Sequence, residues 1–149
     1  MLRSITTIFL LACATAFAAT TATPRPLPPT VLEAKTIYID NQTGKNNLTA
    51  RAIAELKTWG RFTVVNDPAK ADITLTISMQ AKENPDGDDE RTDITLQIML
   101  PHDDIPQFSR TQDTLARFME SEVSKTIRTL RRRVDEQERN KTTSTASMR

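Results

Sequence analysis

Two stretches of alternating apolar and polar residues constrain the fold of this chain more than any other feature. In the first, Ile73, Leu75, Ile77 and Met79 alternate with Thr74, Thr76, Ser78 and Gln80; in the second, Ile94, Leu96, Ile98 and Leu100 alternate with Thr95, Gln97 and Met99. A period of two predicts β-strands with one buried face and one wetter face. The segment between them is polar and contains Pro85 and Gly87, so we expect an antiparallel hairpin.

Further strand and helix signals precede the hairpin. Residues 36–40 and 61–65 are rich in β-branched residues and predict two more strands. A helix over residues 48–59 is predicted by apolar side chains at helical spacing, namely Ala52, Ile53, Leu56 and Trp59. Gly60 then stands where a helix C-cap favours glycine.

A second helical pattern follows the hairpin and predicts a long helix over about residues 112–139. Its apolar side chains recur at spacings of three and four: Leu115, Phe118, Met119, Val123, Ile127, Leu130 and Val134. Such a helix is about 42 Å long, which exceeds the width of a four-stranded sheet, so its C-terminal end is expected to project beyond the domain.

The order strand, helix, strand, strand, strand, helix predicts a two-layer α/β sandwich. We expect an about four-stranded mixed sheet with two helices on one face and a long C-terminal helix, because the opposite sheet face carries Thr, Ser and Gln. A right-handed first crossover makes the first two strands parallel. The domain is predicted to span residues 34–139, and the Ser/Thr-rich residues 140–149 are predicted to be a disordered tail.

The N-terminal residues 1–18 are predicted to be a signal peptide. Arg3 supplies a positive start, residues 5–16 are mostly apolar, and Ala16 and Ala18 suit signal peptidase. The stretch is too short for a permanent membrane helix, so we expect no transmembrane span in the mature chain. Alternatively, residues 10–13 resemble a lipobox in which Cys13 is lipidated. Either route places the domain outside the cytoplasm, periplasmic or secreted, or lipid-anchored.

Proline and charge content limit the remaining possibilities. Residues 19–33 are rich in Pro, Thr and Ala and are predicted to be a semi-rigid spacer that buries nothing. Removing residues 1–18 leaves 19 of the 20 basic residues against 19 acidic residues. This balance argues against a nucleic-acid partner, which requires a basic excess.

The first half of the domain resembles a group of bacterial envelope domains. The residues that carry the resemblance are the strand 36–40, a helix, the segment Phe62 to Asp67, and Ala71-Asp72 directly before the strand that starts at Ile73. Over residues 36–100 the pattern is similar to the N-terminal domain of the translocation protein TolB. It is similar also to related domains of the curli secretion factor CsgG and the penicillin-binding-protein activator LpoB. Ser78-Met79 replaces a glycine common in that group, and no propeller or pore segment follows. The resemblance implies a non-enzymatic envelope module that binds other proteins.

Residues with catalytic or metal-binding chemistry are few. His102-Asp103-Asp104 is the one cluster of residue types that bind metal ions. Zinc needs three or four ligands, and the chain has one histidine and one cysteine, Cys13. A solvated loop is the preferred interpretation. No nucleophile elbow or phosphate-binding glycine loop occurs. The sequence therefore predicts no enzyme, no cofactor and no metal, with a metal-dependent hydrolase using His102 as the alternative.

Two other segments allow more than one interpretation. The acidic residues 84–90 do not match EF-hand spacing and are expected to form a solvated hairpin tip, although weak calcium binding stays open. The apolar residues Val123, Ile127, Leu130 and Val134 either pack on the domain's own sheet or form a coiled-coil seam for self-association.

These features predict a protein-binding or assembly module of the cell envelope, whose partner is another envelope protein. The expected contact surface is the polar sheet face, namely Thr74, Thr76, Thr95 and Gln97, or the projecting part of the last helix. The alternatives are a homo-oligomeric structural protein built on the C-terminal helix and the hydrolase named above.

Overall fold

The computed structural model describes residues 25–82 and 91–146. In chain order its helices and strands are α1 Pro29–Glu33, β1 Thr36–Asn41, α2 Asn46–Trp59, β2 Thr63–Val65, β3 Ile73–Ala81, β4 Arg91–Met99, β5 Phe108–Leu115 and α3 Met119–Ala146, with short 3₁₀ turns at Pro68–Lys70 and Ala116–Phe118. Within these residues no helix combines the length and the apolarity needed to cross a membrane.

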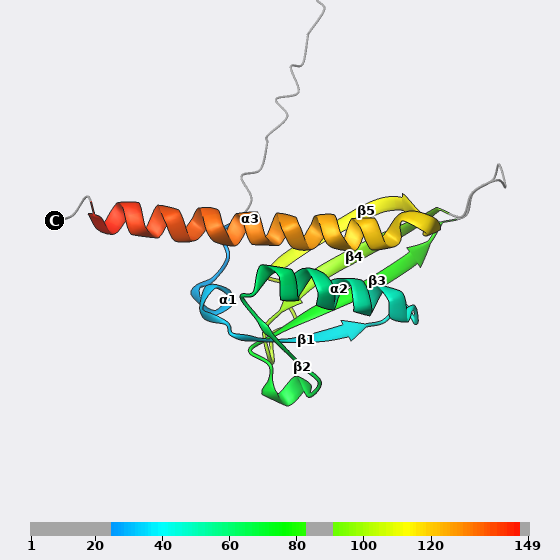
Figure 1. Cartoon of the computed structure of the whole chain (residues 1–149), viewed down its shortest axis with the longest axis horizontal. Helices are drawn as coiled ribbons and strands as arrows, with labels where there is room; N and C mark the ends of the chain where they lie inside the picture. The colour runs from blue at the N-terminus through cyan, green and yellow to red at the C-terminus, as the bar shows by residue number, and fades with distance from the viewer. Residues whose placement is uncertain (1–24, 83–90, 147–149) are drawn as a thin grey trace, which may run out of the picture.

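The strands form one mixed sheet in the order β2-β1-β3-β4-β5. β1 runs parallel to both β2 and β3, whereas β3, β4 and β5 are antiparallel neighbours. The helices α2 and α3 lie together on one side of this sheet (Figure 1). The predicted two-layer α/β fold, the mixed sheet and the parallel first pair of strands are thus confirmed, and β5 adds a fifth strand at one edge.

The core lies between the sheet and the helices. Most of the alternate apolar residues that the hairpin pattern predicted, together with those of β1, form its sheet side: Ile37, Ile39, Ile73, Leu75, Ile77, Ile94, Leu96 and Ile98. Of the other two predicted residues, Leu100 is only partly buried, and Met79 is exposed near the end of β3. Leu48, Ala52 and Leu56 of α2 pack against them and are fully buried. Gly60 ends α2 in the left-handed conformation at φ 72°, which glycine adopts without strain.

The start of the long helix is the main difference from the prediction. Residues 112–115 belong to β5, and α3 begins at Met119. The core-facing side of β5 contains Phe108 and then polar Arg110, Gln112 and Thr114, because these residues lie opposite the buried residues of β4. The strand therefore lacks the apolar alternation that marks β3 and β4, and its Leu115 fits a helical spacing by coincidence.

The end of the long helix also differs from the prediction. α3 continues through Ala146, so residues 140–146 are helical rather than the disordered tail that their composition suggested. Extending an existing helix adds one hydrogen bond per residue without a new nucleus. The hydroxyls of Thr142 and Thr143 also bond back to the carbonyls of Glu138 and Arg139, at 3.1 Å each. The predicted projection is present, since α3 extends past the sheet (Figure 1).

The prediction that residues 19–33 bury nothing is wrong for the part that the structure describes. Leu27, Val31 and Leu32 are buried in the core. Pro29 occupies the first turn of α1, where the missing N–H of proline does no harm, and Val31 and Leu32 are the buried residues of this helix. Gln137 of α3 holds the segment through both backbone groups of Leu27, at 2.9 and 2.7 Å.

The apolar stripe of α3 belongs to the chain's own core. Val123, Ile127, Leu130 and Val134 are all nearly inaccessible to solvent within one copy of the chain. They contact the sheet and α2, and Glu55 of α2 receives two hydrogen bonds from the Arg128 guanidinium at the rim of this contact. A coiled-coil seam built from these four residues is therefore excluded while the fold is intact.

Candidate partner-binding surfaces

The sheet face opposite the helices carries a broad surface on which no side chain is buried. It is formed by the outward residues of all five strands: Thr63, Val65, Thr36, Tyr38, Asp40, Thr74, Thr76, Ser78, Gln80, Arg91, Asp93, Thr95, Gln97, Met99, Ser109, Thr111, Asp113 and Leu115. We call this surface the open face.

The four residues predicted from the sequence lie together on the open face. Thr76 is directly opposite Gln97, and Thr74 is opposite Met99. Thr95 lies one pair further along the same two strands, opposite Ser78. The prediction of a shared surface for Thr74, Thr76, Thr95 and Gln97 is therefore geometrically consistent, although their role in binding stays a prediction.

β5 extends this surface with two residues that the sequence did not reveal. The Thr95 and Thr111 hydroxyls are hydrogen-bonded at 2.8 Å, and the Gln97 amide donates to the Ser109 hydroxyl at 3.4 Å. Ser109 and Thr111 were missed because β5 itself was not predicted. We call the six residues that lie together across β3, β4 and β5 the polar strip: Thr76, Ser78, Thr95, Gln97, Ser109 and Thr111.

A charged cluster closes one end of the open face. Lys82 Nζ lies 2.9 Å from Asp93 and 3.1 Å from Asp113, and Arg91 donates two bonds to Asp113, at 3.0 and 3.2 Å. The bonds from Arg91 and then Lys82 lower the pKa of Asp113, while the bonds to Asp93 and then Asp113 raise the pKa of Lys82. Its two cations and two anions neutralise each other.

The other end of the open face is more apolar. Val65, Tyr38, Thr74 and Met99 form one row across four strands, and all four side chains are partly exposed. Aromatic and methionine side chains are enriched at protein interfaces. From one end to the other, the open face therefore consists of an apolar row, a polar strip and a cluster of charged residues with no net charge.

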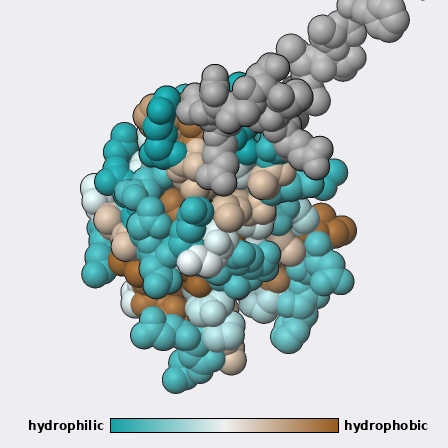
Figure 2. Space-filling model, turned by 90° about the vertical axis from the view of Figure 1, so that its right-hand side faces the viewer, coloured by the Kyte–Doolittle hydropathy of each residue, from teal (hydrophilic) through white to brown (hydrophobic). Residues whose placement is uncertain are grey.

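At the end of the molecule near the start of α3, the described residues form no comparable apolar surface. Met79 and Phe118 are the large exposed hydrophobic side chains in this region. Viewed from this end, hydrophobic residues are scattered among hydrophilic ones rather than joined into one patch (Figure 2). Scattered exposed hydrophobic residues are normal on protein surfaces and do not mark an interface.

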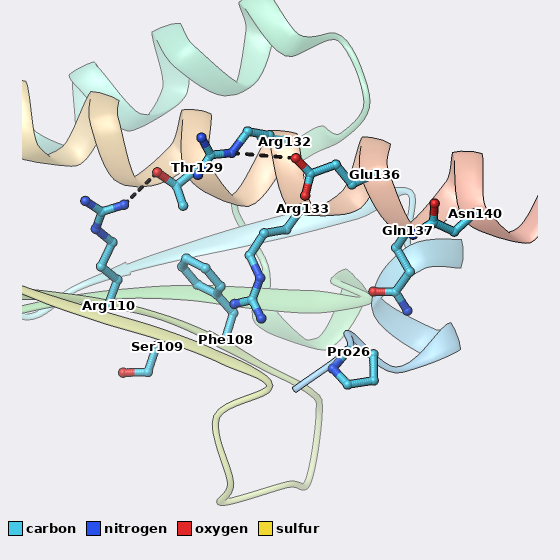
Figure 3. Close-up of a pocket in the computed structure, with 10 residues that line it drawn as sticks. All are labelled: Pro26, Phe108, Ser109, Arg110, Thr129, Arg132, Arg133, Glu136, Gln137 and Asn140. Atoms are coloured by element: carbon cyan, nitrogen blue, oxygen red, sulfur yellow. Dashed lines mark hydrogen bonds and ion pairs between the residues drawn. The ribbon is translucent and has the colours of Figure 1, made fainter. Parts of the chain in front are cut away.

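A groove lies on the other side of β5, below α3 (Figure 3). Its volume is about 570 Å³. One wall consists of Phe108, Ser109 and Arg110, and Pro26 also lines it. The α3 wall is a stripe at spacings of three and four residues: Thr129, Arg132, Arg133, Glu136, Gln137 and Asn140.

The groove carries more positive than negative charge. Arg132 lies 3.9 Å from Glu136, both well exposed. Arg110 donates to the Thr129 hydroxyl at 2.6 Å, and Arg133 lies over the Phe108 ring, 5.5 Å from its centroid. Among residues 25–82 and 91–146, neither Arg110 nor Arg133 has a carboxylate partner.

His102 and its neighbours form an exposed turn after β4. His102 adopts a left-handed conformation at φ 65°. The Asp103 carboxylate accepts hydrogen bonds from the Ile105 amide and the Gln107 side chain, at 3.0 and 2.7 Å, so it stabilises the loop. Nowhere in the described part of the chain do three His, Cys, Asp or Glu side chains gather as a metal site would require. Cys13 and the acidic residues 84–90 lie outside the described residues.

Asp72, the residue before β3, joins the starts of two strands. Its carboxylate accepts the backbone N–H groups of Lys35 and Thr36, at 2.8 and 2.9 Å, and the Thr36 hydroxyl accepts the N–H of Asp72 at 2.9 Å. Ala71 beside it is buried. The Ala71-Asp72 pair that carries the sequence resemblance is thus a structural clamp between β1 and β3.

Replacing Asp72 with alanine is expected to lower the free energy of unfolding by about 1–2 kcal/mol at pH 7, since solvent screens this exposed carboxylate. The hydrogen bonds from the backbone of Lys35 and Thr36 lower the pKa of Asp72 below its ordinary value. The stabilisation from Asp72 is therefore fully present when the pH is above the pKa that Asp72 has in the unfolded chain. It is lost as the pH falls through the lower pKa that Asp72 has in the folded chain. Urea unfolding at pH 7 and pH 3 checks this, with exposed Asp104→Ala as the control. An equal loss at both pH values would contradict it.

Comparison with solved structures returns bacterial proteins of low similarity. PelC from Paraburkholderia phytofirmans, solved as a dodecamer, is 16% identical with a TM-score of 0.43, over 61% of this chain and 83% of that chain. A minor lipoprotein from Acinetobacter baumannii is 12% identical with a TM-score of 0.42, over 70% and 94%. An uncharacterized lipoprotein B from Nitrosomonas europaea is 12% identical with a TM-score of 0.45, over 72% and 83%.

No protein-family model and no curated protein sequence matches the chain. Similarities of this size define neither a family nor a function, so the relation to TolB, CsgG and LpoB stays a prediction from the sequence.

Proposed function

We propose that this chain is an exported, non-enzymatic protein of the bacterial envelope that acts as a protein-binding or assembly module. The observation that carries the proposal is the open face, a whole sheet surface on which none of the outward side chains is buried. The helices pack on the opposite face and leave this surface available to a partner (Figure 1).

The chemistry of the open face favours a protein partner. Its polar strip consists of short hydroxyl and amide side chains, already bonded across the strands, on a continuous sheet surface. The row of Val65, Tyr38 and Met99 beside the strip supplies partly exposed apolar area. A polar region next to an aromatic and methionine-containing region is the composition expected of a protein–protein interface.

Export is proposed from the N-terminal sequence. Residues 1–18 have the charge, apolar core and small residues of a signal peptide, with lipidation of Cys13 as the alternative. Mass spectrometry of the mature protein tests both: a new N-terminus at residue 19 supports cleavage, and a lipidated N-terminal Cys13 supports anchoring. An intact Met1 would contradict export by either route.

Site-specific photo-crosslinking in the native cell tests the binding surface. A photoreactive residue at position 76 or 97 is expected to join the chain to one recurrent envelope protein, because Thr76 and Gln97 lie at the centre of the open face. Thr58, exposed on α2 on the helical side, is the matched control position. Equal crosslinking from position 58, or none from 76 and 97, would contradict the proposal.

A further inference from the structure

The sheet ends on β5, which pairs with β4 on one side only. The antiparallel ladder shows which of its backbone groups face outward. The Lys82 amide donates to the Arg91 carbonyl at 3.0 Å, so Arg91 and every second residue after it in β4 bond to β3. The residues between them bond to β5. This leaves the backbone groups of Ser109, Thr111 and Asp113 on the outer edge of the sheet.

The outer edge is open at Ser109. Within residues 25–82 and 91–146, neither the N–H nor the C=O of Ser109 has a hydrogen-bond partner on that side. Among these described residues, the C=O of Thr111 accepts one side-chain bond on that side, from Gln112 at 2.6 Å. β5 contains no proline that would block the edge. Unpaired strand edges of this kind accept a further strand.

The groove beneath α3 lies along this same edge. Phe108, Ser109 and Arg110 all line it, although side chains of consecutive strand residues point to opposite faces. The wall is therefore the strand edge itself, and the Ser109 backbone groups face the groove. In Figure 3, Phe108 and Arg110 point toward α3, and Ser109 points the other way. A strand placed here would run between β5 and the polar stripe of α3.

Arg110 and Arg133, which have no carboxylate partner among residues 25–82 and 91–146, define the kind of strand that fits. Arg133 uses one donor on the Arg25 carbonyl, at 2.9 Å, and Arg110 uses one on the Thr129 hydroxyl. A guanidinium has five donors, so both retain donors for an anion. Carboxylates are the protein groups that bind guanidinium most strongly, often through two parallel bonds.

We propose that the edge of β5 and the groove beneath α3 bind an extended acidic peptide, which adds to the sheet as a sixth strand. The peptide backbone pairs with the outward groups of Ser109 and Thr111. Every second side chain of the peptide faces the groove and places a carboxylate at Arg110 or Arg133, about 7 Å from the next one. The open face presents the side chains of Ser109 and Thr111, whereas the peptide uses their backbone groups and the side of β5 that faces α3. The edge therefore adds a second binding site to the module.

Two synthetic peptides test the proposal on the purified chain. The first is fluorescein-labelled Thr-Glu-Thr-Glu-Thr-Glu-Thr, and the second has glutamine in place of each glutamate. Fluorescence anisotropy is expected to show binding of the first and at least about tenfold weaker binding of the second, because the charge-assisted bonds are lost. High salt is expected to weaken the first peptide selectively.

Matched arginine variants test the charge requirement. Arg110→Gln is expected to weaken the glutamate peptide about tenfold or more, and Arg133→Gln is expected to do the same. Arg131→Gln removes the same charge from α3 outside the groove, where Arg131 pairs with Asp135 at 3.7 Å, and is expected to leave the affinity unchanged. Equal effects of all three variants would overturn the assignment of the groove.

Hydrogen exchange tests the strand addition directly in the unaltered chain. The amides of Ser109 and Thr111 are expected to exchange more slowly when the glutamate peptide is bound. Ser109→Pro removes one of these outward N–H groups, a change that an edge strand tolerates. We expect this variant to lose peptide binding, and its thermal unfolding midpoint shows whether it is still folded.

Three outcomes would overturn the proposal. The first is equal affinity for the glutamate and glutamine peptides. The second is peptide binding without slower exchange at Ser109 and Thr111. The third is self-association of the chain that Ser109→Pro abolishes while the peptide stays unbound, because a second copy would then occupy the edge. None of these outcomes bears on crosslinking from the open face.

Discussion

Replacing Phe108 with alanine is expected to lower the free energy of unfolding by about 3–5 kcal/mol. Phe108 is the one large apolar side chain on the core-facing side of β5 and is 4% exposed. It lies opposite Ile98 at the edge of the core and also carries the Arg133 guanidinium on its ring. Its removal therefore leaves a cavity between the sheet and α3. Urea unfolding followed by circular dichroism measures the loss.

Ile105→Ala is the matched control for Phe108→Ala. Ile105 lies three residues earlier but is 63% exposed in the loop before β5. We expect its replacement to change the free energy of unfolding by less than about 0.5 kcal/mol. Similar losses for the two variants would contradict the position of β5 as the fifth strand.

Replacing Leu130 with alanine is expected to lower the free energy of unfolding by about 2–5 kcal/mol. Leu130 is 3% exposed and contacts the core from the middle of α3. Because the contact lies within one chain, the unfolding midpoint is expected to be independent of protein concentration. A seam between two copies would instead make the midpoint rise with concentration.

Phe118→Ala is the control for Leu130→Ala, because the sequence pattern assigned both residues to the same apolar stripe. The structure places Phe118 in the turn before α3, 49% exposed, with the Arg117 guanidinium 5.0 Å from its ring centroid. We expect a loss of no more than about 1 kcal/mol. Equal losses for Phe118→Ala and Leu130→Ala would show that the stripe begins where the sequence suggested.

The sheet was predictable where the strands are half-buried. β3 and β4 alternate apolar and polar residues because one face packs on the core, and this pattern is visible without a structure. β5 was not predictable, because as an edge strand it contributes only Phe108 to the apolar core and fills its other core-facing positions with Arg110, Gln112 and Thr114. β5 is a strand because its backbone pairs with β4, and this pairing leaves no pattern in the sequence of β5 itself.

The candidate surfaces were likewise predictable on β3 and β4 and unpredictable on β5. Thr74, Thr76, Thr95 and Gln97 were found because the outward residues of a predicted hairpin share a face. Ser109 and Thr111 complete the polar strip but lie on β5, and the groove joins Arg110 of β5 to Arg133 of α3, 23 positions apart in the chain. Only the folded arrangement brings such residues together.

The proposed binding role of the open face is tested most directly by comparing the envelope proteins recovered with the unaltered chain and with a variant of the open face. Because Thr76 and Gln97 are directly opposite each other, Thr76→Lys combined with Gln97→Glu introduces a favourable cross-strand pair and alters the surface without like-charge repulsion. Thr58→Lys on α2 is the control.

Affinity purification after cross-linking in the native cell, with quantification by mass spectrometry, gives the result. We expect one envelope protein to be recovered with the unaltered chain and with Thr58→Lys. The open-face variant is expected to lose this protein while it retains its thermal unfolding midpoint. Undiminished recovery of that protein with the folded open-face variant would show that the open face is not the binding surface.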